Sequence, residues 1–309
     1  MTDTSKQVFH LTLRSAVNIV IIALLMFTGC KRSDEQGEKA EVTTIQVKGS
    51  DTLVNVAQAW AEQYKNVMPA VDVEVSGGGS GVGIAALLKG TIDIATASRN
   101  MKQEEMEAAK HNTGKDAKEF TLGYDALAVY VHKDNPINEI SLDQLAGIFS
   151  EDGKTTNWSQ LGVTIPGAGE DVIVRVSRQS SSGTYEFFRE HVLQKKDFKL
   201  GSRDMNGSKE VVELVSNTRT AIGYSGMGYA TPSVKMLNIS AKAGEPACPP
   251  TVENTLSKKY ALARSLHIYT LGEPTGAVKQ YIDWILSVAG QKILEENGYV
   301  PVSAANKVN

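Results

Sequence analysis

The segment from Arg178 to Thr184 combines a permanently charged side chain with several hydroxyl groups. It reads Arg-Gln-Ser-Ser-Ser-Gly-Thr and lies between a predicted strand, 172–177, and a helix predicted to begin at Thr184. The N–H groups of a helix's first turn and the helix dipole favour negative charge, and Ser and Thr hydroxyls add further donors. The planar guanidinium of Arg178 matches a tetrahedral oxyanion. The segment therefore predicts an anion site, although a serine-rich turn that only caps the helix fits the pattern equally well.

Three further hydroxyl-rich turns follow predicted strands in the first third of the chain. They are Ser50-Asp51-Thr52, Ser80-Gly81 and Ser98-Arg99. Strands and helices alternate here with short loops, which predicts a mostly parallel sheet covered by helices. Ligands of such sheets bind outside the carboxyl ends of the strands. We therefore expect these turns to converge with the segment that begins at Arg178.

Other kinds of chemistry find little support in the sequence. The glycines from Gly77 to Gly83 fit neither the dinucleotide fingerprint nor a nucleophile elbow. The histidines never cluster at ligand spacing and no cysteine pair accompanies them, so no metal and no cofactor are expected. His191 lies about 10 Å along the predicted helix from Thr184, too far to act as its base, so no catalytic residue is expected. The net charge of −3, with both signs interspersed, argues against a nucleic-acid partner.

Residues 1–29 predict a lipoprotein signal peptide. A 12-residue, almost wholly apolar run from Ala16 to Phe27 is shorter than the ~20 residues that a membrane span needs. It is followed by Thr-Gly-Cys30, which resembles the lipobox of bacterial lipoproteins, whose cysteine is lipidated after cleavage. An ordinary signal peptide with an incidental cysteine is the alternative. Residues 30–43 are polar and charged, and they predict a flexible tether. With Cys30 acylated, only Cys248 remains, so no internal disulfide is expected.

The chain is long enough for two lobes, because single cores rarely grow beyond roughly 250–300 residues. Hydrophobic periodicity predicts a helix from Leu53 to about Met68, and an apolar run predicts a strand over 127–132. A strand-like run over 261–270 could return the chain to the first lobe. One long amphipathic helix is predicted over 276–297, where Gly298 ends it.

Six motifs, taken in order along the chain, resemble the phosphate-binding protein of the bacterial ABC-type phosphate importer, the Pst system. They are Gly49-Ser-Asp-Thr-Leu53, Ser76 to Gly83, Asp93-Ile-Ala-x-x-Ser98-Arg99, Asn157-Trp158, Arg178 to Thr184, and Ala221 to Tyr224. The resemblance implies an α/β protein with the two-lobed type II periplasmic-binding fold, a mostly parallel sheet and flanking helices in each lobe. Lobe 1 is expected to take residues 44–125 and 266–309, and lobe 2 residues 126–265.

The resemblance also implies a function. It predicts an extracytoplasmic, membrane-anchored lipoprotein, not an enzyme, in the periplasm or on the outer face of the cell membrane. This protein would capture inorganic phosphate in the interlobe cleft as a monomer and deliver it to the membrane permease of an ABC importer. The predicted phosphate-binding residues are Ser50, Asp51, Thr52, Leu53, Ser80, Gly81, Ser98, Arg99, Asp125, Arg178, Ser182, Gly183 and Thr184. The alternatives are a receptor for sulfate, molybdate or tungstate, and a serine phosphoesterase.

One departure from the family pattern concerns the proton of the bound phosphate. Well-known members carry an aspartate just after the third strand's serine, where it accepts that proton, and this chain has Arg99 there. Asp51 and Asp125 are the carboxylates nearest to the predicted strand ends, and either could take the role. Asp51 is preferred because it lies beside Thr52. Asp51 could instead cap a helix, and Asp125 could instead form an ion pair with Arg99.

Overall fold

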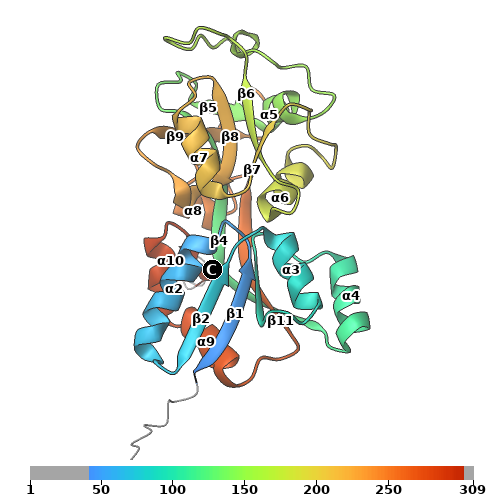
Figure 1. The fold of residues 1–309 in the computed structure, drawn as a ribbon. Coiled ribbons are helices and arrows are strands. Elements are labelled where there is room, and N and C mark those ends of the chain that lie inside the picture. Colours follow the sequence, from blue (N-terminus) through green and yellow to red (C-terminus); the bar gives the residue numbers. More distant parts are fainter. Residues whose placement is uncertain (1–41, 303–309) are drawn as a thin grey trace, which may run out of the picture. The chain divides into compact units, whose positions relative to one another are not determined.

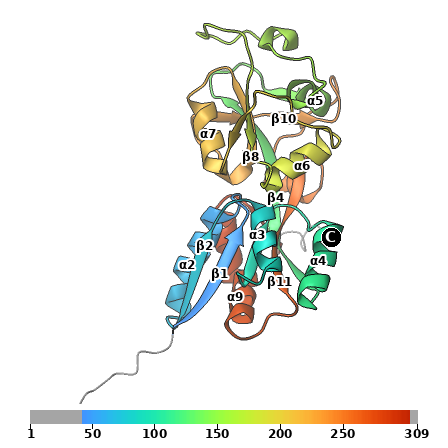
Figure 2. The ribbon, with the colours of Figure 1, turned by 45° about the vertical axis from the view of Figure 1, so that its right-hand side comes forward.

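The computed structural model describes residues 42–302 of the 309-residue chain (Figures 1 and 2). The predicted signal peptide and Cys30 lie outside the described residues, as does the predicted tether except for its last two positions. The first strand, β1, begins at Thr43, which already pairs with Val71 of the neighbouring strand. The predicted end of the tether at residue 43 is therefore wrong by one residue.

The first part of the chain alternates strands and helices, as the sequence predicts. Its elements are β1 (Thr43–Gly49), α2 (Val54–Val67), β2 (Val71–Ser76), α3 (Ser80–Leu88), β3 (Ile94–Ala97) and α4 (Gln103–Thr113). β1 lies between β2 and β3 and pairs in parallel with both. α2 buries Val56, Trp60 and Tyr64, whose spacing places them on one face of the helix. The carboxyl ends of the three strands therefore lie at one edge of the sheet.

α4 is a helix that the sequence analysis missed. Its sequence is QEEMEAAKHNT and only Ala109 is buried, so no apolar periodicity marks it. Glu105 in its first turn accepts a hydrogen bond from the Lys102 N–H at 2.8 Å, which helps to fix where the helix begins.

Two strands occupy the centre of the sheet, β4 (Ala117–His132) and β11 (Ala263–Leu271). They are antiparallel neighbours, and the sheet order is β2-β1-β3-β11-β4-β8-β6-β7. The apolar run over 127–132 predicts only the second half of β4. The charged Lys118 and Glu119 and the glycine at Gly123 hide the strand pattern of its first half.

The remaining elements follow β4 in the chain. They are β5 (Glu139–Ser141), α5 (Leu142–Phe149), η1 (Trp158–Leu161), β6 (Val174–Arg178), α6 (Gly183–His191), β7 (Arg203–Met205), α7 (Ser208–Ser216), β8 (Ala221–Gly226), η2 (Met227–Tyr229), β9 (Val234–Met236), β10 (Asn238–Ser240), α8 (Val252–Leu256), α9 (Gly276–Leu286), α10 (Val288–Glu296) and β12 (Val300–Pro301). β8 pairs with the second half of β4, and β6 pairs in parallel with β8 and β7. The predicted α/β class is confirmed, with parallel ladders on both sides of the central antiparallel strands.

The buried hydrophobic residues form separate clusters around the two halves of β4. Two clusters draw only on residues 42–122 and 266–302. Two others draw only on residues 126–262. The short stretches 123–125 and 263–265 lie between them, on β4 and β11. Figure 1 shows these two strands, in green and orange-red, running from one group of elements to the other.

The predicted single helix over 276–297 is wrong, because two helices occupy this stretch. Ser287 has an extended backbone (φ −71°, ψ 169°) and separates α9 from α10. Gly290 packs so closely that a Cβ atom would lie 2.3 Å from the carbonyl oxygen of Ile285. Apolar periodicity continues through the break, so the sequence pattern conceals it. Within residues 42–302, no helix has the length and apolar composition needed to cross a bilayer.

Candidate functional site

Hydroxyl groups from four separate turns meet in the interior. Thr52 follows β1, Ser80 begins α3, Ser98 follows β3, and Thr184 lies in the first turn of α6. The Oγ1 atoms of Thr52 and Thr184, 132 residues apart in sequence, are 3.0 Å apart. Ser80 Oγ accepts a hydrogen bond from the Ser98 N–H at 3.1 Å. We call these four residues and Gly183 the hydroxyl cluster, and all five are buried.

The N-termini of two helices lie at this cluster. Ser80 is the first residue of α3, and Gly183 is the first residue of α6. A Cβ atom at Gly183 would lie 2.3 Å from Ser80 Oγ and 2.7 Å from Ser98 Oγ, so the two helix ends approach each other closely. Both ends carry the positive pole of a helix dipole, which favours an anion between them.

Arg264 is a residue of this site that the sequence analysis missed. It lies on β11, and its buried guanidinium donates hydrogen bonds to Asp125 and to the hydroxyls of Thr52 and Thr184. The sequence held one signal, an arginine within the largely apolar, strand-like run ALARSLHIY. A charged residue in a buried strand needs a partner of opposite charge.

Asp51 and the buried Arg178 form an ion pair between the turn after β1 and the end of β6. Arg178 Nη2 donates to Asp51 Oδ2 at 2.7 Å, and Asp51 Oδ1 accepts from the Gly78 N–H at 2.8 Å. Burial lowers the pKa of Arg178 while Asp51 raises it, and the guanidinium stays charged. The alternative role of Asp51 as a helix cap is wrong, since Leu53 occupies the N-cap position of α2.

Asp125 is fully buried and faces Arg264, so the alternative of an ion pair with Arg99 is wrong. Its Oδ1 accepts from the Met227 N–H at 3.1 Å, and its Oδ2 accepts two hydrogen bonds from Arg264. Burial raises the pKa of Asp125, although Arg264 and the Met227 N–H oppose this shift. A Cβ atom at Gly226 would lie 3.1 Å from both Asp125 Oδ2 and Thr52 Cγ2, so Asp125 borders the hydroxyl cluster.

Arg99 pairs with Glu105 and not with a residue of the hydroxyl cluster. Its guanidinium donates to both carboxylate oxygens of Glu105, at 2.8 and 2.7 Å, and to the Asn100 carbonyl. Glu105 lies on α4, the helix that the sequence analysis missed, which is why this partner could not be predicted.

The remaining predicted residues around α6 fix the backbone of the turns. Ser182 is the N-cap of α6, and its Oγ accepts from the Thr184 N–H at 3.1 Å. The N–H of Gly81 donates to the Ser181 carbonyl at 3.0 Å and so joins the start of α3 to the turn before α6.

Ser50 and Leu53 hold the turn after β1. The Leu53 N–H donates to the Ser50 carbonyl at 2.9 Å, and the Leu53 side chain is buried in a hydrophobic cluster. The backbone of Leu53 is therefore occupied inside the turn. Within residues 42–302, the buried Oγ of Ser50 has no hydrogen-bond partner.

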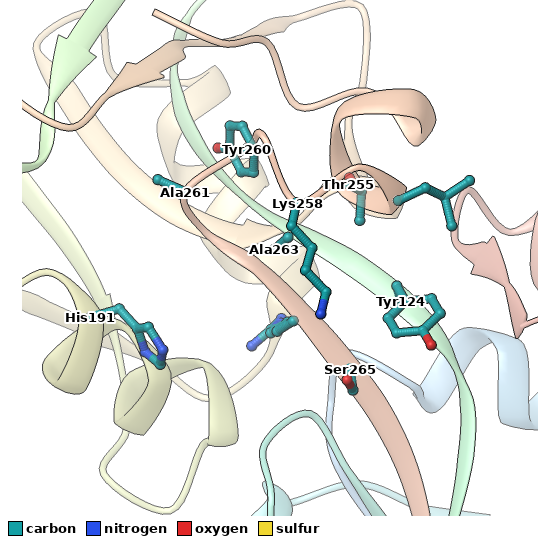
Figure 3. Close-up of a pocket in the computed structure, with 10 residues that line it drawn as sticks. Tyr124, His191, Thr255, Lys258, Tyr260, Ala261, Ala263 and Ser265 are labelled. Atoms are coloured by element: carbon teal, nitrogen blue, oxygen red, sulfur yellow. The ribbon is translucent and has the colours of Figure 1, made fainter. Parts of the chain in front are cut away.

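Two cavities adjoin Arg264. One measures about 580 Å³ and the other about 340 Å³, and both are lined by His191, Arg264 and Ser265. Figure 3 shows the larger cavity, with Lys258 extending toward Tyr124 and Ser265 and with His191 on α6 across from them. Lys258 and His191 thus line the larger cavity together with Arg264, and Glu190 lines the smaller one.

Comparisons with known proteins identify the family. A model described as the PBP superfamily domain matches residues 34–289. The chain is 37% identical over 268 residues to the phosphate-binding protein PstS of Pseudomonas aeruginosa, which covers 83% of this chain and 82% of that protein. The chain belongs to the PstS family.

Solved structures similar to this chain share the fold. A putative phosphate ABC transporter substrate-binding protein from Clostridium perfringens, solved with bound phosphate, matches with a TM-score of 0.73 and 31% identity. That match covers 84% of this chain and all of the other. An ABC-type phosphate transport receptor from Vibrio cholerae matches with a TM-score of 0.65 and 28% identity, covering 83% of this chain and 99% of that one. The periplasmic-binding-protein fold predicted from the six motifs is therefore confirmed.

Proposed function

We propose that the chain is an extracytoplasmic solute-binding lipoprotein that captures inorganic phosphate and delivers it to the membrane permease of an ABC importer. The PstS relatives and the phosphate-bound Clostridium perfringens protein support this proposal. The observation that carries it is the hydroxyl cluster, in which buried hydroxyls and two helix N-termini converge beside Arg264. Arg178 pairs with Asp51, the residue before Thr52 of this cluster. Such a set of donors matches a tetrahedral oxyanion.

The proposed ligand set follows from the contacts. It comprises Thr52, Ser80, Ser98, Arg178, Ser182, Gly183 and Thr184, with Asp51 and Asp125 as candidate acceptors of the phosphate proton. Ser50 and Gly81 support the turns. Leu53 is left out because its N–H closes the turn after β1, and Arg99 because both of its Nη atoms pair with Glu105. Arg178 is kept, because its contacts use four of its five N–H donors and leave one Nη1 hydrogen for the anion.

Binding would require the two sides of the site to separate. The hydroxyls of Thr52 and Thr184 touch, so an anion can lie between them only after they move apart. We propose that lobe 1 (44–125 and 266–309) moves against lobe 2 (126–265) about the two strands β4 and β11. The separation of the hydrophobic clusters on either side of 123–125 and 263–265 supports this division.

Isothermal titration of the purified chain with phosphate, sulfate, molybdate and tungstate tests the proposal. We expect a Kd at or below about 1 μM for phosphate and much weaker binding of the other anions. Tighter binding of sulfate, molybdate or tungstate than of phosphate would show that phosphate is not the ligand. Turnover of p-nitrophenyl phosphate would instead indicate a phosphoesterase. Among the described residues, no hydroxyl of the cluster hydrogen-bonds to a histidine or a carboxylate, which supports binding without catalysis.

Gly183→Ala is expected to weaken phosphate binding. The added methyl group would displace the hydroxyls of Ser80 and Ser98 or hold the two helix ends apart. Overpacking typically costs about 1–3 kcal/mol, which is roughly five- to 150-fold in Kd. Gly169→Ala is the matched control, because a Cβ atom there meets nothing within 4 Å. Equal affinities for both variants would show that the close approach at Gly183 does not matter for binding.

Lipidation of Cys30 is proposed from the sequence alone. A Cys30→Ala chain is expected to lose the acyl group and to be released or left unprocessed. The wild-type chain, expressed in the same bacterial host, should incorporate a labelled fatty acid, and the variant should not. Absence of label from the wild-type chain would contradict the anchor, while phosphate binding by the folded domain would be unaffected.

A further inference from the structure

The short helix η2, which follows β8, contacts both the turn after β1 and the segment after α10. Tyr229 is its last residue, and the Tyr229 hydroxyl donates to the Asp51 carbonyl at 2.7 Å. The two residues are 178 positions apart in the sequence. Asp51 belongs to proposed lobe 1 and Tyr229 to proposed lobe 2, so this hydrogen bond joins the lobes at a point outside the hydroxyl cluster.

The ring of Tyr229 is anchored on proposed lobe 2. It packs against the hydrophobic cluster that includes Tyr130 and Val211, whose members all lie within residues 126–262. Burial raises the pKa of the Tyr229 hydroxyl, although the charge of Arg178 opposes this shift. The hydroxyl therefore keeps its proton at neutral pH and remains a donor toward the other lobe.

The backbone of η2 lies directly against the backbone of the segment after α10. A Cβ atom at Gly228 would lie 2.4 Å from the Asn297 carbonyl oxygen and 3.1 Å from Tyr299 Cζ. Gly298 has a φ of +81°, and a Cβ atom there would lie 2.9 Å from Gly228 Cα. Residues 297–299 belong to proposed lobe 1. The closed arrangement of the lobes thus depends on two glycines that face each other across the boundary.

Tyr299 holds the same turn after β1, but from within proposed lobe 1. Its hydroxyl donates to the Thr52 carbonyl at 2.5 Å, and its ring is buried in a cluster of that lobe. Two tyrosines therefore hold the carbonyls of two consecutive residues, Asp51 and Thr52. When the lobes separate, the contact of Tyr299 can persist, whereas the contact of Tyr229 must break.

We propose that η2 is a latch, in which Gly228 packs against residues 297–299 and Tyr229 binds the Asp51 carbonyl only when the lobes are closed. Tyr229 is then a positioning residue, because it raises the affinity for the anion without contacting it. This inference rests on the proposed function, since it requires the lobes to close on a bound anion. A contact made only in the closed protein slows release of the ligand, because the lobes must part before the anion leaves.

Stopped-flow measurement of phosphate association and dissociation for a Tyr229→Phe chain tests the latch. Phenylalanine keeps the ring and removes only the hydrogen bond to the Asp51 carbonyl. We expect phosphate to dissociate about three to ten times faster than from the wild-type chain, which is the contribution of one neutral hydrogen bond. The association rate should stay unchanged, because the latch forms after the anion has entered.

Gly228→Ala tests the backbone contact of the latch. The added methyl group would meet the Asn297 carbonyl and hold η2 away from it, so phosphate should dissociate at least about tenfold faster. Gly169→Ala is the control for this variant, because a Cβ atom there meets nothing within 4 Å. It should release phosphate at the wild-type rate.

Tyr260→Phe is the matched control for Tyr229→Phe. Tyr260 is a buried tyrosine whose hydroxyl donates to the Leu127 carbonyl at 2.9 Å, and both residues lie in proposed lobe 2. The control therefore loses the same kind of hydrogen bond, but not one between the lobes. Its melting temperature should fall, while its dissociation rate for phosphate should match that of the wild-type chain.

The outcomes of these measurements separate the latch from the proposed function. A dissociation rate less than twice the wild-type value, in a folded Tyr229→Phe chain that binds phosphate, would overturn the latch and leave the proposed function intact. An equal acceleration in Tyr260→Phe would also overturn it, because that variant breaks no contact between the lobes. If Gly228→Ala does not fold, Tyr229→Phe decides alone. A wild-type chain that binds no phosphate would remove the proposed function and the latch with it.

Discussion

Asp125→Asn is expected to abolish most of the chain's discrimination between phosphate and sulfate. The two anions are nearly isosteric, but near neutral pH phosphate keeps at least one proton and sulfate keeps none. A buried carboxylate gains a hydrogen bond from the first and meets only repulsion from the second. Sites that recognise a substrate hydrogen in this way discriminate by ~10⁴–10⁵, because the wrong ligand leaves buried polar groups unpaired. An amide in place of Asp125 should reduce that ratio by orders of magnitude, mainly by strengthening sulfate binding.

The contacts move our preference from Asp51 to Asp125. Both oxygens of Asp51 have partners outside the hydroxyl cluster, whereas Asp125 borders Thr52 and shares Arg264 with it. Titrations of Asp51→Asn and Asp125→Asn with both anions separate the two candidates, with Arg99→Ala as the control. Loss of selectivity only in Asp51→Asn would return the role to Asp51. If the ratio of phosphate affinity to sulfate affinity is unchanged in both variants, neither aspartate accepts the phosphate proton.

The pH dependence of selectivity gives a second measurement. Asp125 can accept the phosphate proton only when it is ionised, so selectivity should be present above its pKa and should be lost as the pH falls through it. Because burial raises this pKa, the loss on acidification should begin at a higher pH than for an exposed aspartate. Asp125→Asn should remove this pH dependence of the phosphate-to-sulfate ratio.

Arg178→Ala is expected to weaken phosphate binding by about thirtyfold to several thousandfold, or roughly 2–5 kcal/mol. The change removes the remaining Nη1 donor of Arg178 and leaves Asp51 without its cation in a nearly buried position. Lysine should rescue only part of this loss, because it lacks the planar fork. A change smaller than threefold in the titration would contradict any role of Arg178 in binding.

The Asp51→Asn/Arg178→Ala double variant separates the two contributions of Arg178. If the loss comes mainly from an unpaired Asp51 that opposes closure, neutralising Asp51 should recover much of the affinity. If Arg178 itself carries the anion, the double variant should bind as weakly as Arg178→Ala. The second outcome would assign direct contact to Arg178.

The parts of the site that the sequence predicts correctly are those encoded locally. The turn from Arg178 to Thr184 carries its own signals, namely hydroxyls, a glycine and a helix start, and the structure has α6 beginning at Gly183. Alternation of short strands and helices similarly predicts the sheet edge where Thr52 and Ser98 lie.

The parts that could not be predicted depend on contacts between distant segments. Arg264 meets Thr184 and Thr52 from 80 and 212 positions away, and nothing in its neighbourhood indicates either partner. Arg99 pairs with Glu105 on α4. Because α4 buries a single residue, no apolar periodicity in the sequence indicates this helix. The break at Ser287 is likewise a consequence of packing, because apolar spacing continues across it.

The position of β11 has a consequence for how the protein is made. β3 and β4 are synthesised early, yet they are separated in the sheet by a strand that leaves the ribosome only near the end of the chain. Until β11 arrives, both strands expose unpaired edges, and non-local pairing of this kind is slow and open to aggregation. A nascent chain therefore lacks both the finished sheet and Arg264. If the chain is exported as proposed, this delay would favour its passage through the membrane in an unfolded state, before it can bind phosphate.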